Sequence, residues 1–122
     1  AAQRLLNEAA RYLGTPYVWG GYSPSGFDCS GFVSYCLTHS GVRNTGRLTA
    51  QGLYDICTPV SQSEAQPGDL IFFTGTYDAG VPVTHIGIYV GNGQMIHCGH
   101  PVQYTSINSP YWQSHFYGFG RW

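Results

Sequence analysis

The stretch GFDCSGFVSYCL, residues 26–37, decides how this chain can fold. A loop rich in Gly, Ser and Pro (residues 20–26) precedes it, and apolar residues then follow at helical spacing. These apolar residues are Phe32, Val33, Cys36 and Leu37. Gly41 is placed as a C-terminal cap. The sequence therefore predicts a helix that begins at or near Cys29.

Cys29 is a candidate nucleophile because of where that helix begins. Unpaired backbone N–H groups and the helix dipole favour a thiolate at a helix N-terminus. The neighbours Asp28, Ser30 and Gly31 are polar or small, which suits an open approach. The alternative is that Cys29 is a small buried residue, since free cysteine is among the most buried residue types. Two histidines later in the chain favour the nucleophile, because an activated cysteine needs a base and an orienting group.

Size and charge limit the possible functions. With 122 residues the chain fits one domain, 1–122, which we expect to be excised from a larger protein. Only 9% of residues are charged and no basic stripe exists, which argues against nucleic-acid binding. No apolar run approaches the roughly 20 residues of a membrane span. A surface of tyrosine, hydroxyl and amide groups suits neutral carbohydrate or peptide polymers.

The four cysteines form no CxxC pair, which disfavours a tetrathiolate zinc site. If Cys29 is the nucleophile, three remain, and three cannot all pair within the chain. We expect Cys36 and Cys57 to be mostly buried thiols, and one disulfide stays open.

The first half of the chain reads as helices and loops. Residues 3–13 have an amphipathic helical pattern that Gly14 and Pro16 stop. In the aromatic loop 15–21 we expect Trp19 to anchor the core and Tyr17 to face a cleft. A short helix is predicted at 50–56 with Thr49 as its N-cap.

The second half reads as strands after the turn at residues 67–69. The predicted strands cover residues 70–74, 85–90, 94–98, 102–106 and 116–121. Loop 75–83, between the first two, is placed to overhang the site. Helices followed by strands predict an α+β fold with an antiparallel sheet.

The hairpin between His85 and His97 decides whether the two rings meet. Residues 85–90 alternate, with His85 on the face opposite Ile86. A two-residue turn would place His97 opposite Ile88, on the wrong face. A three-residue loop, 91–93, places it opposite Gly87 and about 7 Å from His85 along the diagonal. We predict the three-residue loop.

This arrangement predicts acyl transfer through a thioester. His85 would take the proton of Cys29, and a Cys–His pair can lower a thiol pKa by several units. His97 would bond the far nitrogen of His85 and fix its tautomer. The N–H of Cys29 and the hydroxyl of Tyr17 are candidate oxyanion donors.

The remaining histidines offer one other kind of site. His39 and His115 read as surface residues, whereas His100 could join His85, His97 and a cysteine around zinc. Residues 97 and 98 point to opposite faces of a strand, so one ion could not bind both without a bulge.

The chain resembles the NlpC family of papain-like bacterial cell-wall peptidases. The resemblance covers nearly the whole chain in family order. The matching blocks are residues 14–21 (GTPYVWGG), 27–33 (FDCSGFV), 67–73 (PGDLIFF), 85–93 (HIGIYVGNG) and 95–97 (MIH).

The resemblance implies a papain-like fold, with N-terminal helices packed on a barrel-like antiparallel sheet, and no cofactor. It implies cleavage of peptidoglycan stem peptides, typically between γ-D-glutamyl and a diamino acid. The implied location is extracellular, in the cell wall or in the periplasm, for a secreted bacterial or phage-derived protein. The implied catalytic residues are Cys29, His85 and His97. A further wall-binding domain or an immunity protein is a possible partner.

The resemblance also implies a substrate-binding group. Tyr17, Asp28 and Ser30 match positions that hold the free amine of an N-terminal L-alanine in relatives. A carboxylate beside the nucleophile can anchor an ammonium. It should also oppose thiolate formation slightly.

Two alternatives remain open. One is an N-acetylmuramoyl-L-alanine amidase type of lysin, which would use a related Cys–His layout. The other is a non-catalytic module that grips the wall with its tyrosines. The intact set of Cys29, His85 and His97 favours an enzyme.

Overall fold

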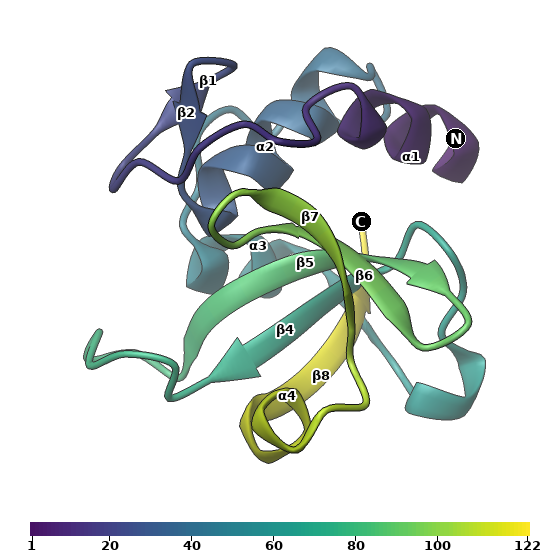
Figure 1. The fold of residues 1–122 in the computed structure, drawn as a ribbon. Coiled ribbons are helices and arrows are strands. Elements are labelled where there is room, and N and C mark those ends of the chain that lie inside the picture. The colour runs from purple at the N-terminus through teal and green to yellow at the C-terminus, as the bar shows by residue number, and fades with distance from the viewer.

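Three helices cover one face of a six-stranded antiparallel sheet, as the computed structural model of residues 1–122 shows (Figure 1). The helices are α1 (Ala2–Ala10), α2 (Cys29–His39) and α3 (Ala50–Ile56). The strands of the sheet are β3 (Thr58–Val60), β4 (Leu70–Thr74), β5 (Val83–Gly91), β6 (Gln94–Cys98), β7 (Val102–Ser106) and β8 (Phe116–Arg121). The predicted α+β class is confirmed. None of the helices combines the length and the hydrophobicity that a membrane-spanning segment needs.

The sheet has the strand order β3-β8-β4-β5-β6-β7. Strand β4 therefore lies between β5, which follows it in the sequence, and β8, the last strand of the chain. The sheet curls in Figure 1. Its two edge strands are β3 and β7. The predicted strands 70–74, 94–98, 102–106 and 116–121 match residue for residue. Helix α3 and its cap are also confirmed, since the Thr49 hydroxyl accepts a hydrogen bond from the N–H of Gly52 at 3.0 Å.

Five short elements were not predicted from the sequence. They are β1 (Tyr22–Ser23), β2 (Gly26–Phe27), β3, the 3-10 helix η1 (Gln62–Glu64) and α4 (Pro110–His115). Most of these have two or three residues, too few to show a periodic pattern. Helix α4 is under two turns long, although Ser109 caps it and Pro110 starts it, as at many helix N-termini.

The sheet separates two apolar clusters. Along β4, Leu70 and Phe72 pack against the helices, whereas Ile71 and Phe73 face the other side. The same alternation runs along β5, where Ile86 and Ile88 join the helix side. The predicted alternation of β5 is therefore confirmed.

The β5–β6 turn differs from the prediction. Gly91 pairs with Gln94, so the loop has two residues, Asn92 and Gly93, both with positive φ as in a type I′ turn. The predicted three-residue loop is wrong. Val90 is an extra, unpaired residue in β5, and this bulge makes up for the shorter turn. On the side of the bulge away from the turn, Ile88 pairs with Ile96. This register brings His97 opposite Gly87, as expected.

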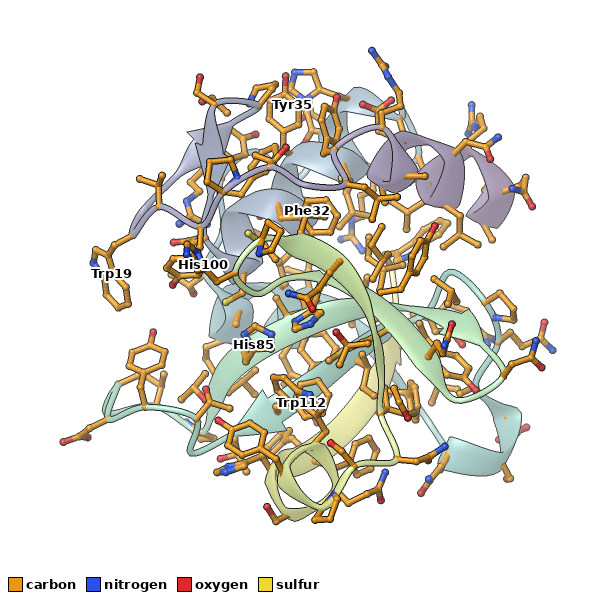
Figure 2. All side chains as sticks on the ribbon, viewed as in Figure 1. Trp19, Phe32, Tyr35, His85, His100 and Trp112 are labelled. Carbon is orange, nitrogen blue, oxygen red and sulfur yellow. The ribbon has the colours of Figure 1, made fainter.

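Trp19 does not anchor the core. Its side chain is 73% exposed, and its ring meets Tyr77 edge-on at 5.5 Å between centroids. Phe27 fills the core instead, because the chain around Tyr17 runs beside β2 and the Val18 N–H bonds the carbonyl of Phe27 at 2.9 Å. Trp19 is left at the tip of the aromatic loop (Figure 2).

Candidate active site

Cys29 is the first residue of α2, as predicted. The Asp28 side chain caps this helix by accepting the N–H of Gly31 at 2.6 Å. A Cβ atom on Gly31 would lie 1.9 Å from the carbonyl oxygen of Gly21, so a glycine is required where the preceding loop crosses the helix start. The loop and the cap together fix the position of Cys29.

The sulfur of Cys29 lies against strand β5 beside His85. Sγ is 3.9 Å from the carbonyl oxygen of Thr84, the residue before His85. The backbone N–H of Ile86, the residue after it, favours the thiolate. The tip of α2 therefore meets the sheet at the histidine that the sequence predicts as the base.

His85 and His97 contact each other directly. Nε2 of His85 lies 2.9 Å from Nδ1 of His97, and their rings are nearly perpendicular. Gly87 makes room for this contact, since a Cβ atom there would lie 3.2 Å from Cβ of His97 and 2.8 Å from Sδ of Met95. The prediction that the two rings share a face is confirmed.

Two further residues support the pair and were not predicted. Oγ1 of Thr105 lies 2.8 Å from Nε2 of His97, and Trp112 stacks on His85 with 5.1 Å between ring centroids (Figure 2). Thr105 could have been predicted from the strand 102–106. Gln103 pairs with His97, and Thr105, two residues further along, lies on the same face of the sheet as Gln103 and His97. Trp112 lies in the short helix α4, which has no such pattern.

Burial keeps both histidines neutral. It lowers the pKa of His85 to about 3, with a smaller contribution from the neighbouring His97. Burial alone lowers the pKa of His97 to about 4. Neutral imidazoles can each accept one proton, so His85 is available as a base at neutral pH.

The expected low pKa of Cys29 is not found. Burial, and after it the charge of Asp28, raises the thiol pKa to about 11. The N–H groups of Ile86 and Ser30 and the charge of Arg47 act in the opposite direction but are outweighed. The predicted opposition of Asp28 is confirmed, whereas the prediction of a thiolate stabilised by the helix N-terminus is wrong. At rest the site holds a thiol and a neutral imidazole.

Alkylation kinetics can test this resting state. With a thiol pKa of about 11, the rate of Cys29 modification by iodoacetamide should rise roughly tenfold per pH unit between about pH 7 and pH 9. Mass spectrometry of the peptide that contains Cys29 separates this rate from those of the other thiols. A rate that levels off near neutral pH would instead indicate a preformed thiolate–imidazolium pair.

A cleft of about 580 Å³ opens beside Cys29. Its walls come from the aromatic loop, the start of α2, the connection 42–48, helix α3 and the loop between β4 and β5. They include Tyr17, Trp19, Arg47, Gln51, Tyr77 and Val81. The predictions that Tyr17 faces a cleft and that loop 75–83 borders the site are confirmed. Burial and the nearby Cys29 raise the pKa of Tyr17 to about 12, so its hydroxyl remains a neutral donor.

Asp28 and Ser30 form a bonded cluster with Arg47 at one wall of the cleft. Nη2 of Arg47 lies 2.5 Å from Oδ2 of Asp28, and Nη1 donates to Oγ of Ser30 at 2.9 Å. Ser30 in turn donates to Oδ1 of Asp28 at 3.3 Å. Arg47 was not singled out in the sequence, because the polar connection 42–48 has neither helical nor strand periodicity.

The other cysteines and histidines lie elsewhere. Sγ of Cys98 donates to the carbonyl of Phe27 on the helix side, away from His97. His39 and His100 are exposed, and Nδ1 of the half-buried His115 donates to the carbonyl of Thr74 at 2.7 Å. No group of three or more His, Cys, Asp or Glu side chains is placed to hold a metal ion. All four cysteines are free thiols, with Cys36 buried and Cys57 half-buried.

Known proteins are similar to this chain in sequence and in fold. Residues 14–121 match the model of the NlpC/P60 family. The chain is 44% identical over 121 residues to the bifunctional muramidase/DL-endopeptidase CwlT of Bacillus subtilis (strain 168). It is 48% identical over 118 residues to the probable endopeptidase p60 of Listeria seeligeri.

These matches cover 98% and 96% of this chain but only 36% and 21% of the two relatives. In a crystal structure of a lipoprotein-like NLP/P60 family protein from Staphylococcus aureus subsp. aureus Mu50, the match has a TM-score of 0.92 and 44% identity. It covers 98% of this chain and 40% of that one. From its first glycine block to its last strand, the chain belongs to the NlpC/P60 family.

Proposed function

We propose that this chain is a cysteine endopeptidase that hydrolyses the stem peptides of peptidoglycan. One observation carries the proposal: the Cys29 thiol lies at a cleft and against the β5 backbone beside His85, which is bonded to His97 and through it to Thr105. The names of CwlT, a DL-endopeptidase, and p60, a probable endopeptidase, support the same reaction class.

The proposed roles of the two histidines require one set of tautomers. If Nε2–H of His97 donates to Thr105, its Nδ1 accepts Nε2–H of His85. Nδ1 of His85 then carries the lone pair that takes the proton of Cys29. His97 acts as the orienting member of a Cys-His-His triad.

The reaction proceeds in two steps. Sγ of Cys29 attacks the scissile carbonyl carbon while its proton moves to His85, because the resting thiol is neutral. The protonated His85 gives this proton to the leaving amine, and a thioester remains. His85 then activates water, which attacks the thioester, releases the new carboxylate and restores the thiol. The N–H of Cys29 and the hydroxyl of Tyr17 stabilise the oxyanion in both steps.

The proposed scissile bond joins γ-D-glutamate to the diamino acid. The DL-endopeptidase in the name of CwlT supports this choice. Tyr17, Asp28 and Ser30 would contact the L-alanine end of the stem. We place the domain, residues 1–122, in a longer protein that acts in the cell wall or periplasm, where a wall-binding domain could accompany it.

Digestion of purified peptidoglycan tests the proposal. Mass spectrometry should find new C-terminal γ-D-glutamyl groups and new N-terminal diamino acids. An amidase would instead release stems that begin with L-alanine and leave the lactyl carboxylate on the glycan. A binding module would sediment with the wall and create no new termini. Either of these two results would contradict the proposal.

Removing the Thr105 hydroxyl should slow catalysis moderately. In Thr105→Val the buried Nε2–H of His97 loses its acceptor, which costs about 1–3 kcal/mol and corresponds to roughly a tenfold lower kcat. KM should change little, because Thr105 does not line the cleft. Steady-state kinetics on a soluble muropeptide measure both constants. Thr58→Val, at an exposed position on β3, is the matched control, and an equal loss there would contradict the role of Thr105.

A further inference from the structure

No carboxylate is paired with the two histidines of the site. The three ion pairs of the chain join arginine side chains to Glu8, Asp28 and Asp69, and none of them includes a histidine. Burial and the neighbouring His97 both lower the pKa of His85, and no carboxylate raises it. The group that orients His85 is thus a neutral imidazole, where an aspartate would bring a full negative charge. The imidazolium that forms during the reaction must be stabilised by another group, because a buried charge without a partner is costly.

The indole of Trp112 lies over the imidazole of His85 (Figure 2). The two ring planes are 27° apart with 5.1 Å between centroids, whereas His97 meets the same indole at 87°. The face of an indole carries negative charge density, and it attracts a cation within about 6 Å of the ring centroid. A proton on His85 therefore creates a cation within reach of this attraction.

Helix α4 holds the indole in this place and contributes little else to the core. None of its six residues is fully buried. Two hydrogen bonds fix the helix: Nε2 of Gln113 donates to the carbonyl of Ile107 and Nδ1 of His115 to that of Thr74, each at 2.7 Å. From β4, Phe73 packs against the indole with 4.7 Å between ring centroids. The helix is therefore built to present one side chain to the base.

We propose that Trp112 is a positioning residue that holds the ring of His85 against its indole face and stabilises the imidazolium there. The attraction is weak for the neutral ring at rest and strong once His85 has taken the proton of Cys29. It therefore lowers the barrier of the reaction without tightening the binding of substrate. This inference rests on the proposed endopeptidase activity and adds a residue to its mechanism.

Fluorinated tryptophans at position 112 test the inference. Fluorine withdraws electron density from the indole face and changes its shape little, so packing persists while the attraction to a cation falls. Suppression of a stop codon at this position can introduce monofluoro, difluoro and trifluoro forms. We expect kcat on a soluble muropeptide to fall with each added fluorine, by about tenfold in all, while KM stays unchanged.

Two ordinary variants separate the ring face from the bulk of the side chain. Trp112→Phe and Trp112→Leu both shrink the side chain, but only phenylalanine keeps an aromatic face. We expect Trp112→Phe to retain severalfold more kcat than Trp112→Leu. The matched control is the trifluoro residue at position 122, because Trp122 donates to the carbonyl of Gly68 outside the cleft. This replacement should leave both constants unchanged.

A kcat that stays constant across the fluorinated forms would overturn the inference, because it would show that Trp112 acts by packing alone. A series in which only KM changes would overturn it as well, since the residue would then bind substrate. Should Trp112→Leu fail to fold, the fluorinated forms, which keep the indole shape, still decide. If the wild-type domain digests no peptidoglycan, the proposed function itself fails, whereas a constant kcat in an active enzyme removes only the role of Trp112.

Discussion

Replacing Cys29 with alanine is expected to abolish hydrolysis, with kcat lowered about 10⁴-fold or more, as for removal of a nucleophile from a triad. No other thiol lines the cleft, so none can attack a bound stem in its place. Release of new γ-D-glutamyl termini from peptidoglycan, followed by mass spectrometry, measures the loss. The fold should persist, because the change removes only one sulfur atom at the border of the core.

Cys57→Ala is the control for Cys29→Ala. Cys57 is half-buried at the end of α3 and faces Gly120, away from the cleft. The Cys57→Ala variant should hydrolyse peptidoglycan at the wild-type rate. Both variants should sediment with purified wall as the wild type does. Substantial hydrolysis by Cys29→Ala, or an equal loss in Cys57→Ala, would contradict the assigned nucleophile.

The second large effect is expected at His85. His85→Gln keeps a side chain that can hydrogen-bond His97 but removes the base, so kcat should fall about 10³-fold, within the usual range for general acid–base catalysis. KM should stay close to that of the wild type, because His85 acts by proton transfer and is assigned no contact that binds the ground-state substrate. Single-turnover and steady-state kinetics on a soluble muropeptide separate the two constants.

The matched control removes a histidine that has no such contacts. His100 is exposed near the end of β6, and His100→Gln should leave kcat and KM unchanged (Figure 2). A His85→Gln variant that keeps more than about a tenth of the wild-type kcat would show that another group accepts the proton.

The long elements were predictable because their residues are buried in a regular pattern. Strands β4 and β6 follow apolar runs bounded by turn residues, and β5 alternates because its two faces lie in different clusters. The two-residue turn at Asn92 was missed because loop length and a bulge at Val90 compensate each other. The sequence pattern predicts the face on which His97 lies. It does not distinguish a three-residue loop from a two-residue turn with a bulge, because both place His97 on that face.

The site was predictable only where the residue type carries the chemistry. Cys29, His85 and His97 stand out as a nucleophile and two imidazoles. Thr105 and Arg47 are residue types found on any surface, and only tertiary contacts reveal that they support the site.

The pKa of Cys29 was misjudged for a different reason. The helix N-terminus favours a thiolate, but this effect is small compared with the loss of hydration at a buried sulfur. The sequence shows the first influence and gives no measure of the second.

The sulfur and the imidazoles come from opposite halves of the chain, one at the tip of α2 and the others on β5 and β6. During synthesis, a ribosome-bound chain that has emerged only as far as β4 carries the thiol without its base. Peptidase activity should therefore appear late and in a single step, when the β5–β6 hairpin packs against the helices. A truncated or misassembled molecule should be inert.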